Sequence, residues 1–579
     1  MNRLRLVGIV ALFVGQTPSL SPGLAAQAGA SMTTFNWTLN NFDLSGHRYV
    51  TPTQITRDNV KTLVPRWMFQ TGVIDGVSNQ TTPIVVDGTM YVTDPRGSVY
   101  AVNAADGHFL WNYDVTDLIG GNAKDGYIFR HRGAVYGDGV VYSAGGASLF
   151  ALDAKTGKPI KTFGTAGQAN PLMDVLKEVY PDVKSPISMG YSFTVAPQFY
   201  KGMLYIGANR SESHIPGGYM MAVDAKTGKV KWWFNTVPQT QRDQGWDIAG
   251  PTWVGGERAG GGVWGTPPID PELGLLYFAA GNPFGDSKKR AGMNLFSDCV
   301  IALNLETGKM KWYFQETHHD VWDYDSAAAP TLFDMQVNGR LVKAISHGSK
   351  SGLMFILDRE TGQPVHPVKE MPVSTDAGPG EHPWPTQPFQ FTASGKLMEP
   401  LYDIPAVDIA PSQLAKGFKP VPLFTPPGPN QVRPSGGNNY GPTAYSPRTG
   451  LLYIPAIDTP TGSGRDPKGA FSAYDPTTGE LKWRQKYDGY GQAGAVVTAS
   501  DLVFVGAGSN TAGYFYAFDA RTGEMLWKFN TGSGVFSSPS VYMVNGEQFV
   551  AVGSGGGERG RRGGDAILAF ALPKPFAKP

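Results

Sequence analysis

The sequence contains a single cysteine, Cys299, in 579 residues. One cysteine excludes an intrachain disulfide, and the lack of a Cys-x-x-Cys-His motif excludes covalently attached c-type haem. If the protein transfers electrons, we expect them to leave to a separate acceptor. Cys299 itself precedes an apolar run, as expected of a small buried hydrophobic side chain.

Excess charge and long apolar segments are also absent. The formal net charge is +1, which gives no reason to expect nucleic acid or an acidic membrane surface as a partner. The glycine- and arginine-rich stretch 555–564 is flanked by strand patterns, so we interpret it as a loop. No stretch approaches the roughly 20 apolar residues that a membrane-spanning helix needs.

The first 30 residues have the pattern of a secretory signal peptide. A basic start at residues 1–5 precedes a short apolar run at 6–15 and a segment of small residues ending at Ala30. The pattern predicts cleavage between Ala26 and Ala30 and a soluble protein in a bacterial periplasm. A chain of this length would usually contain several domains. We nevertheless expect residues 31–579 to form one domain, because the sequence repeats described next predict a single closed ring.

Helical periodicity is scarce, and the segment 170–180 is one of few plausible helices. Instead, an eleven-residue phrase, Ala-x-Asp-x-x-x-Gly-x-x-x-Trp, recurs along the chain. In each copy an apolar alternating run ends in Asp or Asn and a glycine closes a turn, and in the five close copies Trp begins a second strand. Five close and two degenerate copies occupy residues 101–111, 222–232, 302–312, 473–483 and 517–527, and 151–161 and 356–366.

These repeats predict an all-β protein. Spacings of 40 to 50 residues fit a four-stranded blade, and longer spacings indicate blades with inserted loops. The tryptophan ring is large enough to dock between neighbouring units. With the closing strand 566–572 paired to the N-terminal region, we predict an eight-bladed β-propeller. The proline-rich region 366–435 is predicted to be an insertion over one mouth of the ring.

The candidate chemistry lies in residues that break the repeat. Residues 317–325 (THHDVWDYD) place two histidines and three aspartates after a repeat strand. By itself this segment also fits a polar turn capped by aspartates. Glu212 and Asn282 follow strands of two other blades, and strand ends of different blades converge on the propeller axis. Carboxylate and amide oxygens gathered there would form the ligand set that Ca²⁺ prefers.

The chain resembles the dehydrogenases that depend on pyrroloquinoline quinone (PQQ), which include bacterial methanol, ethanol, polyol and membrane glucose dehydrogenases. The resemblance covers nearly everything from Asn36 to Leu572. It rests on the ordered segments Arg132-Gly133, Ser211-Glu212, 260–266 (GGGVWGT), 270–273 (DPEL), 281–283 (GNP), 319–323 (HDVWD) and 357–359 (LDR).

By motif match, the resemblance implies that Glu212, Asn282 and Asp323 hold the metal, with Asp323 as the general base. Asp323 would accept the alcohol proton while hydride passes to PQQ, whose carbonyl the cation polarises. Other positions are implied to contact the cofactor: Trp264 stacks on one face, Arg132 and Thr194 meet its carboxylates and carbonyls, Lys350 lies beside the reactive oxygens, and Gln80, Ser211 and Asn439 complete the set.

Two departures from the family pattern bear on metal and substrate. The adjacent cysteines of alcohol-oxidising members are absent from the stretch before Arg132, as in the glucose and polyol branch. Asp325 adds a carboxylate where lanthanide-using members have one, yet Trp-Asp-x-Asp also occurs in the glucose branch. We favour Ca²⁺, with a lanthanide ion as the alternative.

For the substrate, the missing disulfide and the long insertion favour a polyol or a bulky secondary or cyclic alcohol. An aldose of the glucose type is the alternative. Two other classes compete with the dehydrogenase: a non-catalytic scaffold of related repeats, and a hydrolase or lyase using the same carboxylates. The scaffold would lack the combination of Glu212, Trp264, Asn282 and Asp323.

Overall fold

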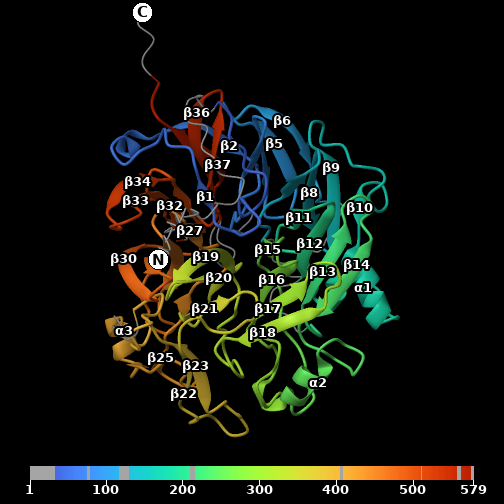
Figure 1. Ribbon diagram of the computed structural model, residues 1–579, viewed down its shortest axis with the longest axis vertical. Helices are drawn as coiled ribbons and strands as arrows, with labels where there is room; N and C mark the ends of the chain where they lie inside the picture. The colour runs from blue at the N-terminus through green and yellow to red at the C-terminus, as the bar shows by residue number, and fades with distance from the viewer. Residues whose placement is uncertain are drawn as a thin grey trace, which may run out of the picture.

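The computed structural model describes residues 33–74, 78–116, 130–208, 215–403, 409–509, 512–556 and 563–574. These residues form eight sheets of three to five strands that follow one another around a central axis (Figure 1). The predicted all-β, eight-bladed propeller is therefore confirmed. The predicted signal peptide lies outside the described residues, as do positions 557–562 of the connection between the last two strands.

The first four blades take the strands in chain order. They are β3 (Ile84–Val86), β4 (Thr89–Thr93), β5 (Val99–Asn103) and β6 (Phe109–Tyr113); β7 (Val135–Gly137), β8 (Val140–Gly145), β9 (Ser148–Asp153) and β10 (Gln168–Ala169); β11 (Gln198–Tyr200), β12 (Met203–Ala208), β13 (Tyr219–Asp224) and β14 (Val230–Asn235); and β15 (Ile269–Asp270), β16 (Leu275–Ala280), β17 (Cys299–Asn304) and β18 (Met310–Gln315).

The other four blades complete the ring. They are β19 (Thr331–Val337), β20 (Arg340–Gly348) and β21 (Met354–Asp358); β26 (Gly436–Gly437), β27 (Ala444–Ser446), β28 (Leu451–Asp458), β29 (Lys468–Asp475) and β30 (Glu480–Asp488); β1 (Tyr49–Val50), β31 (Ala495–Thr498), β32 (Leu502–Gly508), β33 (Gly513–Asp519) and β34 (Met525–Asn530); and β2 (Val64–Gln70), β35 (Ser540–Val544), β36 (Glu547–Gly555) and β37 (Asp565–Ala571).

The chain termini close the ring as expected. Strand β2 pairs antiparallel with β37, with Gln70 opposite Ala566 and Val64 opposite Ala571. The short strand β1 adds to the seventh blade by pairing parallel with β31. Two blades thus combine strands from both ends of the chain, so the ring forms only when the termini meet.

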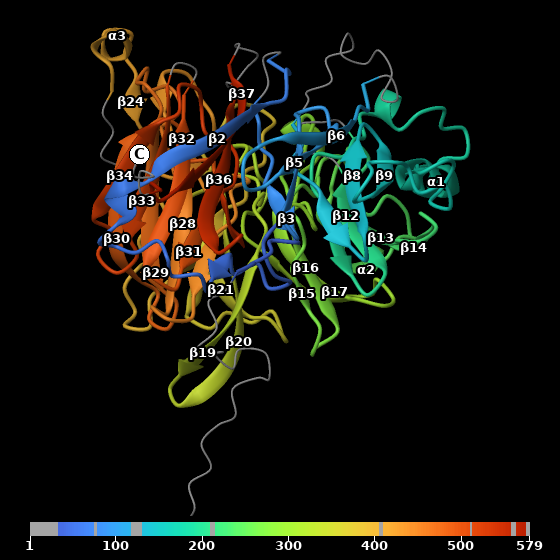
Figure 2. The same cartoon turned by 90° about the horizontal axis from the view of Figure 1, so that it is seen from above.

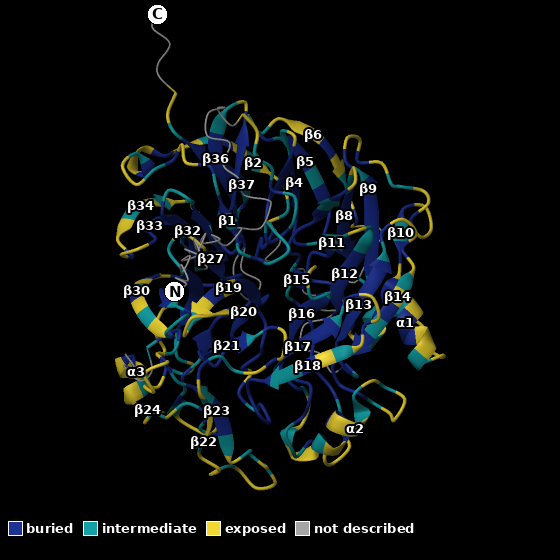
Figure 3. Ribbon diagram, viewed as in Figure 1, coloured by how far each residue is buried: buried dark blue, intermediate teal, exposed yellow. Residues whose placement is uncertain are grey.

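Helices are few and peripheral. The predicted helix is α1 (Pro171–Val179), flanked by Asn170 and Tyr180; the other α-helices of the described chain are α2 (Trp246–Ala249) and α3 (Pro411–Leu414). None of the helices in the described ranges is long and apolar enough to cross a membrane. Buried residues concentrate in the strands, and exposed residues in the outer loops and helices (Figure 3). Cys299 is fully buried in β17, as predicted.

Tryptophans in the last strands of the blades join five pairs of neighbouring blades. Each indole N–H donates to the carbonyl of the residue that follows the repeat Asp or Asn in the neighbouring blade, at 3.0–3.2 Å. The pairs are Trp67–Ala104, Trp111–Ala154, Trp232–Leu305, Trp312–Arg359 and Trp483–Ala520. The repeat glycine of the neighbour lies against the same ring, and a Cβ on Gly157 would come within 2.5 Å of Trp111.

A degenerate repeat keeps this joint with a different side chain. His366 stands where five other copies have Trp. Its Nε2 lies 2.8 Å from the carbonyl oxygen of Pro476, the residue after the repeat Asp475. Because a carbonyl only accepts, the imidazole donates as an indole would.

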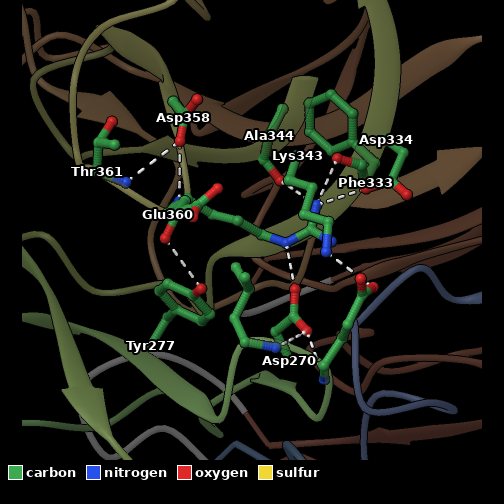
Figure 4. Close-up of polar contacts among 12 residues, drawn as sticks. Asp270, Tyr277, Phe333, Asp334, Lys343, Ala344, Asp358, Glu360 and Thr361 are labelled. Carbon is green, nitrogen blue, oxygen red and sulfur yellow. Dashed lines mark hydrogen bonds and ion pairs between the residues drawn. The ribbon is translucent and has the colours of Figure 1, made fainter. Parts of the chain in front are cut away.

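An ion-pair cluster also joins blades four and five (Figure 4). Nε of Arg359 lies 2.7 Å from Oδ2 of Asp270, and its Nη1 lies 2.7 Å from Oδ1 of Asp334. The carbonyl of Arg359 accepts hydrogen bonds from Tyr277 and Trp312. Two segments that carry the family resemblance, 270–273 and 357–359, therefore stabilise the contact between blades.

The proline-rich insertion lies between blades five and six. It contains the hairpin of β22 (Val368–Pro372) and β23 (Thr386–Gln390), helix α3, and the pair β24 (Lys419–Pro420) and β25 (Gln431–Val432); residues 404–408 are outside the described chain. Seen side-on, α3 lies at one face of the ring and the turn of β19 and β20 projects from the opposite face (Figure 2).

Candidate active site

The predicted site residues lie in two kinds of segment. Gln80, Arg132, Thr194 and Trp264 precede the first strands of blades one to four, and Asn439 precedes β27. Asn282 follows β16 and Lys350 follows β20, the second strands of their blades, while Asp323 and Asp325 lie between β18 and β19. In a propeller blade, first strands begin where second strands end, so both kinds of segment open on the same mouth of the ring.

Lys350 links two of the three carboxylates in the candidate catalytic segment, residues 317–325. Its Nζ lies 3.3 Å from Oδ2 of Asp323 and also contacts Oδ2 of Asp325. Oδ1 of Asp325 accepts the backbone N–H of Asn282 at 3.2 Å, and the Asn282 amide lies 3.5 Å from Oδ1 of Asp323. The structure thus brings together four of the predicted residues from three separate segments.

The two carboxylates differ in exposure. The side chain of Asp325 is fully buried, whereas that of Asp323 is 58% exposed. Asp323 also has a backbone φ of +69°, in the left-handed region. Asp320 bridges this turn, because its carboxylate oxygens accept the N–H groups of Trp322 at 2.6 Å and Tyr324 at 2.7 Å. Burial raises the pKa of Asp320 to about 6, although these two hydrogen bonds oppose the shift.

A second group of residues surrounds Arg132. Its Nη1 donates to the carbonyl and hydroxyl oxygens of Thr194, both at 3.0 Å, and lies 3.3 Å from the Trp264 carbonyl oxygen. The guanidinium carbon is 5.2 Å from the ring centroid of Trp264 and 4.7 Å from that of Tyr440. Nζ of Lys350 is 5.7 Å from the Trp264 ring. Two cations therefore lie within cation–π range of one indole.

Several buried polar atoms at this mouth have no hydrogen-bond partner among the described residues. They come from four different segments and are Oε1 of Gln80, Nε1 of Trp264, Oδ1 of Asn282 and Oδ1 of Asn439. Buried polar groups are normally paired, so such a concentration requires an explanation. Together with Arg132 and Lys350, these atoms suit a polar, anionic group bound between the segments.

Histidine 131, beside Arg132, is buried and neutral. Its Nδ1 accepts the N–H of Gly133 at 3.4 Å and lies 3.2 Å from Oγ1 of Thr93, which places the ring hydrogen on Nε2. Burial, together with the positive charge of the neighbouring Arg132, lowers the pKa of His131 to about 3.

Only some of the predicted metal ligands lie among the described residues. Asn282, Asp323 and Asp325 are neighbours, but Glu212 and the adjacent Ser211 lie outside the described residues. Within the described ranges no three His, Cys, Asp or Glu side chains gather as a metal site. The predicted set of Glu212, Asn282, Asp323 and Asp325 stays a prediction.

Sequence reasoning assigned no role to two residues of this region. Tyr440 packs with Trp264 and Ala327 beneath Arg132; its position next to Asn439 was the available signal. Asp298 is fully buried, and burial with three nearby carboxylates raises its pKa well above the usual value. Nothing in the local sequence around Asp298 indicates that burial.

Comparisons with known proteins agree with this geometry. The family model "PQQ: Glucose/ethanol/alcohol dehydrogenase, beta-propeller domain" matches residues 37–464 and 485–550. The quinohemoprotein alcohol dehydrogenase of Comamonas testosteroni is 30% identical over 617 residues, which cover 96% of this chain and 79% of that protein. The quinoprotein alcohol dehydrogenase PedH of Pseudomonas putida is 30% identical over 588 residues, covering 92% and 91%.

A solved structure gives the same result in three dimensions. The crystal structure of quinohemoprotein alcohol dehydrogenase from Comamonas testosteroni aligns with a TM-score of 0.73 and 27% sequence identity, covering 94% of this chain and 81% of that one. The ranges that the family model matches include every predicted site residue that the structure describes.

Proposed function

The chain belongs to the family of PQQ-dependent glucose, ethanol and alcohol dehydrogenases, and we propose that it oxidises a polyol or a bulky secondary or cyclic alcohol to the carbonyl compound. As a member of this family it is an oxidoreductase that acts on alcohols. The observation that supports the site best is the contact of one lysine, Lys350, with the carboxylates of Asp323 and Asp325 beside Asn282.

The described residues fit PQQ as the cofactor. Arg132 and Lys350 supply positive charge for its carboxylate and carbonyl oxygens, and the Trp264 indole supplies a flat surface and an N–H without a described partner. Gln80, Thr194 and Asn439 line the same mouth with polar atoms, and Ser211 is proposed from its motif. When bound, the quinone supplies the two-electron acceptor, which no amino-acid side chain provides.

Asp323 is proposed as the general base that takes the proton of the substrate hydroxyl. Its carboxylate is exposed, while Asp325 is buried and contacts Lys350 and the backbone N–H of Asn282. A carboxylate is an effective base only when partly desolvated. We therefore propose that bound cofactor and substrate cover Asp323 and exclude water from it.

Ca²⁺ is the proposed metal, held by Asp323, Asn282 and Glu212. A lanthanide would need the charge of Asp325 as well, but the side chain of Asp325 is fully buried, whereas that of Asp323 is exposed. The side-chain oxygen Oδ1 of Asn282 is buried without a partner among the described residues, so it is a suitable ligand for a hard cation. Metal reconstitution tests this choice: activity with La³⁺ but not Ca²⁺ would reverse it.

The cellular setting is proposed from the sequence. A cleaved signal peptide would deliver the protein to the periplasm, where a separate cytochrome c or quinone-linked protein would accept the electrons. Fractionation of cells expressing the full chain, with N-terminal sequencing of the product, tests export and cleavage between Ala26 and Ala30.

The function is tested by adding PQQ and Ca²⁺ to the purified apo-protein and measuring dye reduction with methanol, sorbitol, a fused-ring secondary alcohol and glucose. We expect reduction that needs both additions and favours the larger alcohols. Activity confined to methanol would reject the proposed substrate class, and activity confined to glucose would favour an aldose dehydrogenase. Failure to bind PQQ would reject the proposed function.

A further inference from the structure

The proline-rich insertion holds the catalytic segment at its beginning. The side chain of Gln387 in β23 forms two hydrogen bonds with the backbone of His318: Oε1 accepts its N–H, and Nε2 donates to its carbonyl oxygen, both at 2.8 Å. The imidazole of His318 lies 3.1 Å from Glu370 of β22. The hairpin of β22 and β23 therefore fixes both the backbone and the side chain of His318.

The insertion also holds both neighbours of Asp323. The indole N–H of Trp322 donates to the carbonyl of Thr425 at 2.7 Å, and the hydroxyl of Tyr324 donates to the carbonyl of Pro434 at 2.6 Å. Both acceptors lie about a hundred residues further along the chain. Asp323 thus lies between two side chains that are tied to the same distant region.

Phe424 packs edge-on against both side chains, which stack on each other with their ring centroids 5.7 Å apart. Its ring centroid lies 5.3 Å from that of Trp322, 5.7 Å from that of Tyr324 and 5.6 Å from that of Phe389, all at edge-on angles. Phe424 is fully buried and has a φ of +62°. A bulky side chain rarely adopts this left-handed conformation, and such conformations concentrate at functional sites.

Asp320 holds the opposite side of the same turn through the N–H groups of Trp322 and Tyr324. The side chains of these two residues are fixed by the insertion, and their backbones are fixed by Asp320. The remaining freedom at Asp323 is rotation of its own short, exposed side chain.

From these contacts we infer that the insertion positions the catalytic base, and that Tyr324 and Phe424 are positioning residues for the reaction. This inference rests on the proposed function of Asp323. It assigns to the insertion a role beyond substrate choice, because five of its residues, Glu370, Gln387, Phe424, Thr425 and Pro434, contact the segment 317–325. Proximity and orientation contribute strongly to catalysis, and a displacement of about 1 Å can cost up to a hundredfold in rate.

The test compares Tyr324→Phe with Tyr142→Phe in protein loaded with PQQ and Ca²⁺. Both changes remove one hydroxyl: that of Tyr324 donates to Pro434, and that of Tyr142 donates to Ala225 at a distant contact between blades two and three. We expect Tyr324→Phe to lower kcat by about tenfold without changing KM for the alcohol or the Kd for PQQ measured by tryptophan fluorescence. Tyr142→Phe should leave kcat unchanged.

A second variant and a second measurement keep the test decisive. Phe424→Leu should lower kcat in the same way and increase hydrogen exchange in the peptide 318–326 of the apo-protein, which Tyr142→Phe should not. If wild type is active and neither Tyr324→Phe nor Phe424→Leu changes kcat, the positioning role is overturned and the proposed function stands. Wild type that binds PQQ but oxidises no alcohol would overturn the proposed function and this inference together.

Discussion

The ammonium group of Lys350 contacts the buried carboxylate of Asp325 and lies 3.3 Å from that of Asp323. Two carboxylates therefore share one positive charge. Without this charge, the two carboxylates would repel each other at the mouth of the ring. The cation proposed to bind at Asp323 and Asn282 would supply positive charge at the same place. Lys350 and the metal are therefore expected to substitute partly for each other in stabilising the fold.

Lys350→Met is expected to destabilise the apo-protein by about 3 kcal/mol, because removing one partner leaves a buried charge without compensation. Saturating Ca²⁺ should restore more stability to this variant than to wild type, since the ion binds the folded state. Urea unfolding with and without Ca²⁺ measures both effects. Equal stabilisation of the two proteins by Ca²⁺ would contradict this relationship.

Asp323→Asn is expected to lower kcat by about 10²- to 10⁴-fold, because the amide cannot accept the hydroxyl proton. PQQ binding should persist, since the described contacts suited to the cofactor belong to other residues. Rapid-mixing assays with dye reduction, together with fluorescence titration of PQQ, separate the two effects. Turnover comparable to wild type would remove Asp323 as the base.

Gly157→Ala is expected to destabilise the propeller more than Gly139→Ala. Both glycines are in blade two and have positive φ, +69° and +85°, so they share the strain of a left-handed alanine. Only the Cβ at position 157 would collide, at 2.5 Å from Trp111, whereas that at 139 meets nothing within 4 Å. We expect a difference of about 1–3 kcal/mol from this overlap, measured by denaturant unfolding; equal losses would show that the contact between Gly157 and Trp111 adjusts freely.

His131→Gln is expected to flatten the acid limb of the stability profile of the apo-protein. Burial holds the pKa of His131 at about 3, below its ordinary 6.5. Between these two pH values the unfolded chain binds a proton at His131 and the folded chain does not. Wild-type stability should therefore fall as pH drops from 6.5 toward 3, by about 1.4 kcal/mol per pH unit from this group. Unfolding free energies at pH 4, 5, 6 and 7 should show a shallower slope in the variant; parallel slopes would indicate a protonated His131 in the fold.

The repeat made the architecture predictable from the sequence. Each close copy encodes a strand, a turn with glycine at positive φ, and a tryptophan, and these are local features of a few residues. The docking of Trp111 on Gly157 repeats between other blades, so one motif specifies several identical joints. The degenerate copy with His366 shows that the joint needs an N–H donor of suitable reach rather than tryptophan itself.

The proximity of Asp323, Asn282 and Lys350 was predictable from the sequence, but their detailed geometry was not. The motif around Asp323 indicated a carboxylate near Asn282 and Lys350, and the structure brings them together. That Asp323 is exposed while Asp325 is buried against Lys350 could not be predicted, because two aspartates two residues apart look alike in a sequence.

By itself, then, the sequence determined the blade, its repetition and the residue types at the mouth of the ring, because these depend on contacts within or between successive repeats. Only the tertiary structure decided what holds the segment 317–325 in place. The contacts of Phe424 with Trp322 and of Pro434 with Tyr324 join residues about a hundred positions apart. Such pairs carry no periodic signal, since they form only where the insertion folds back across the blades.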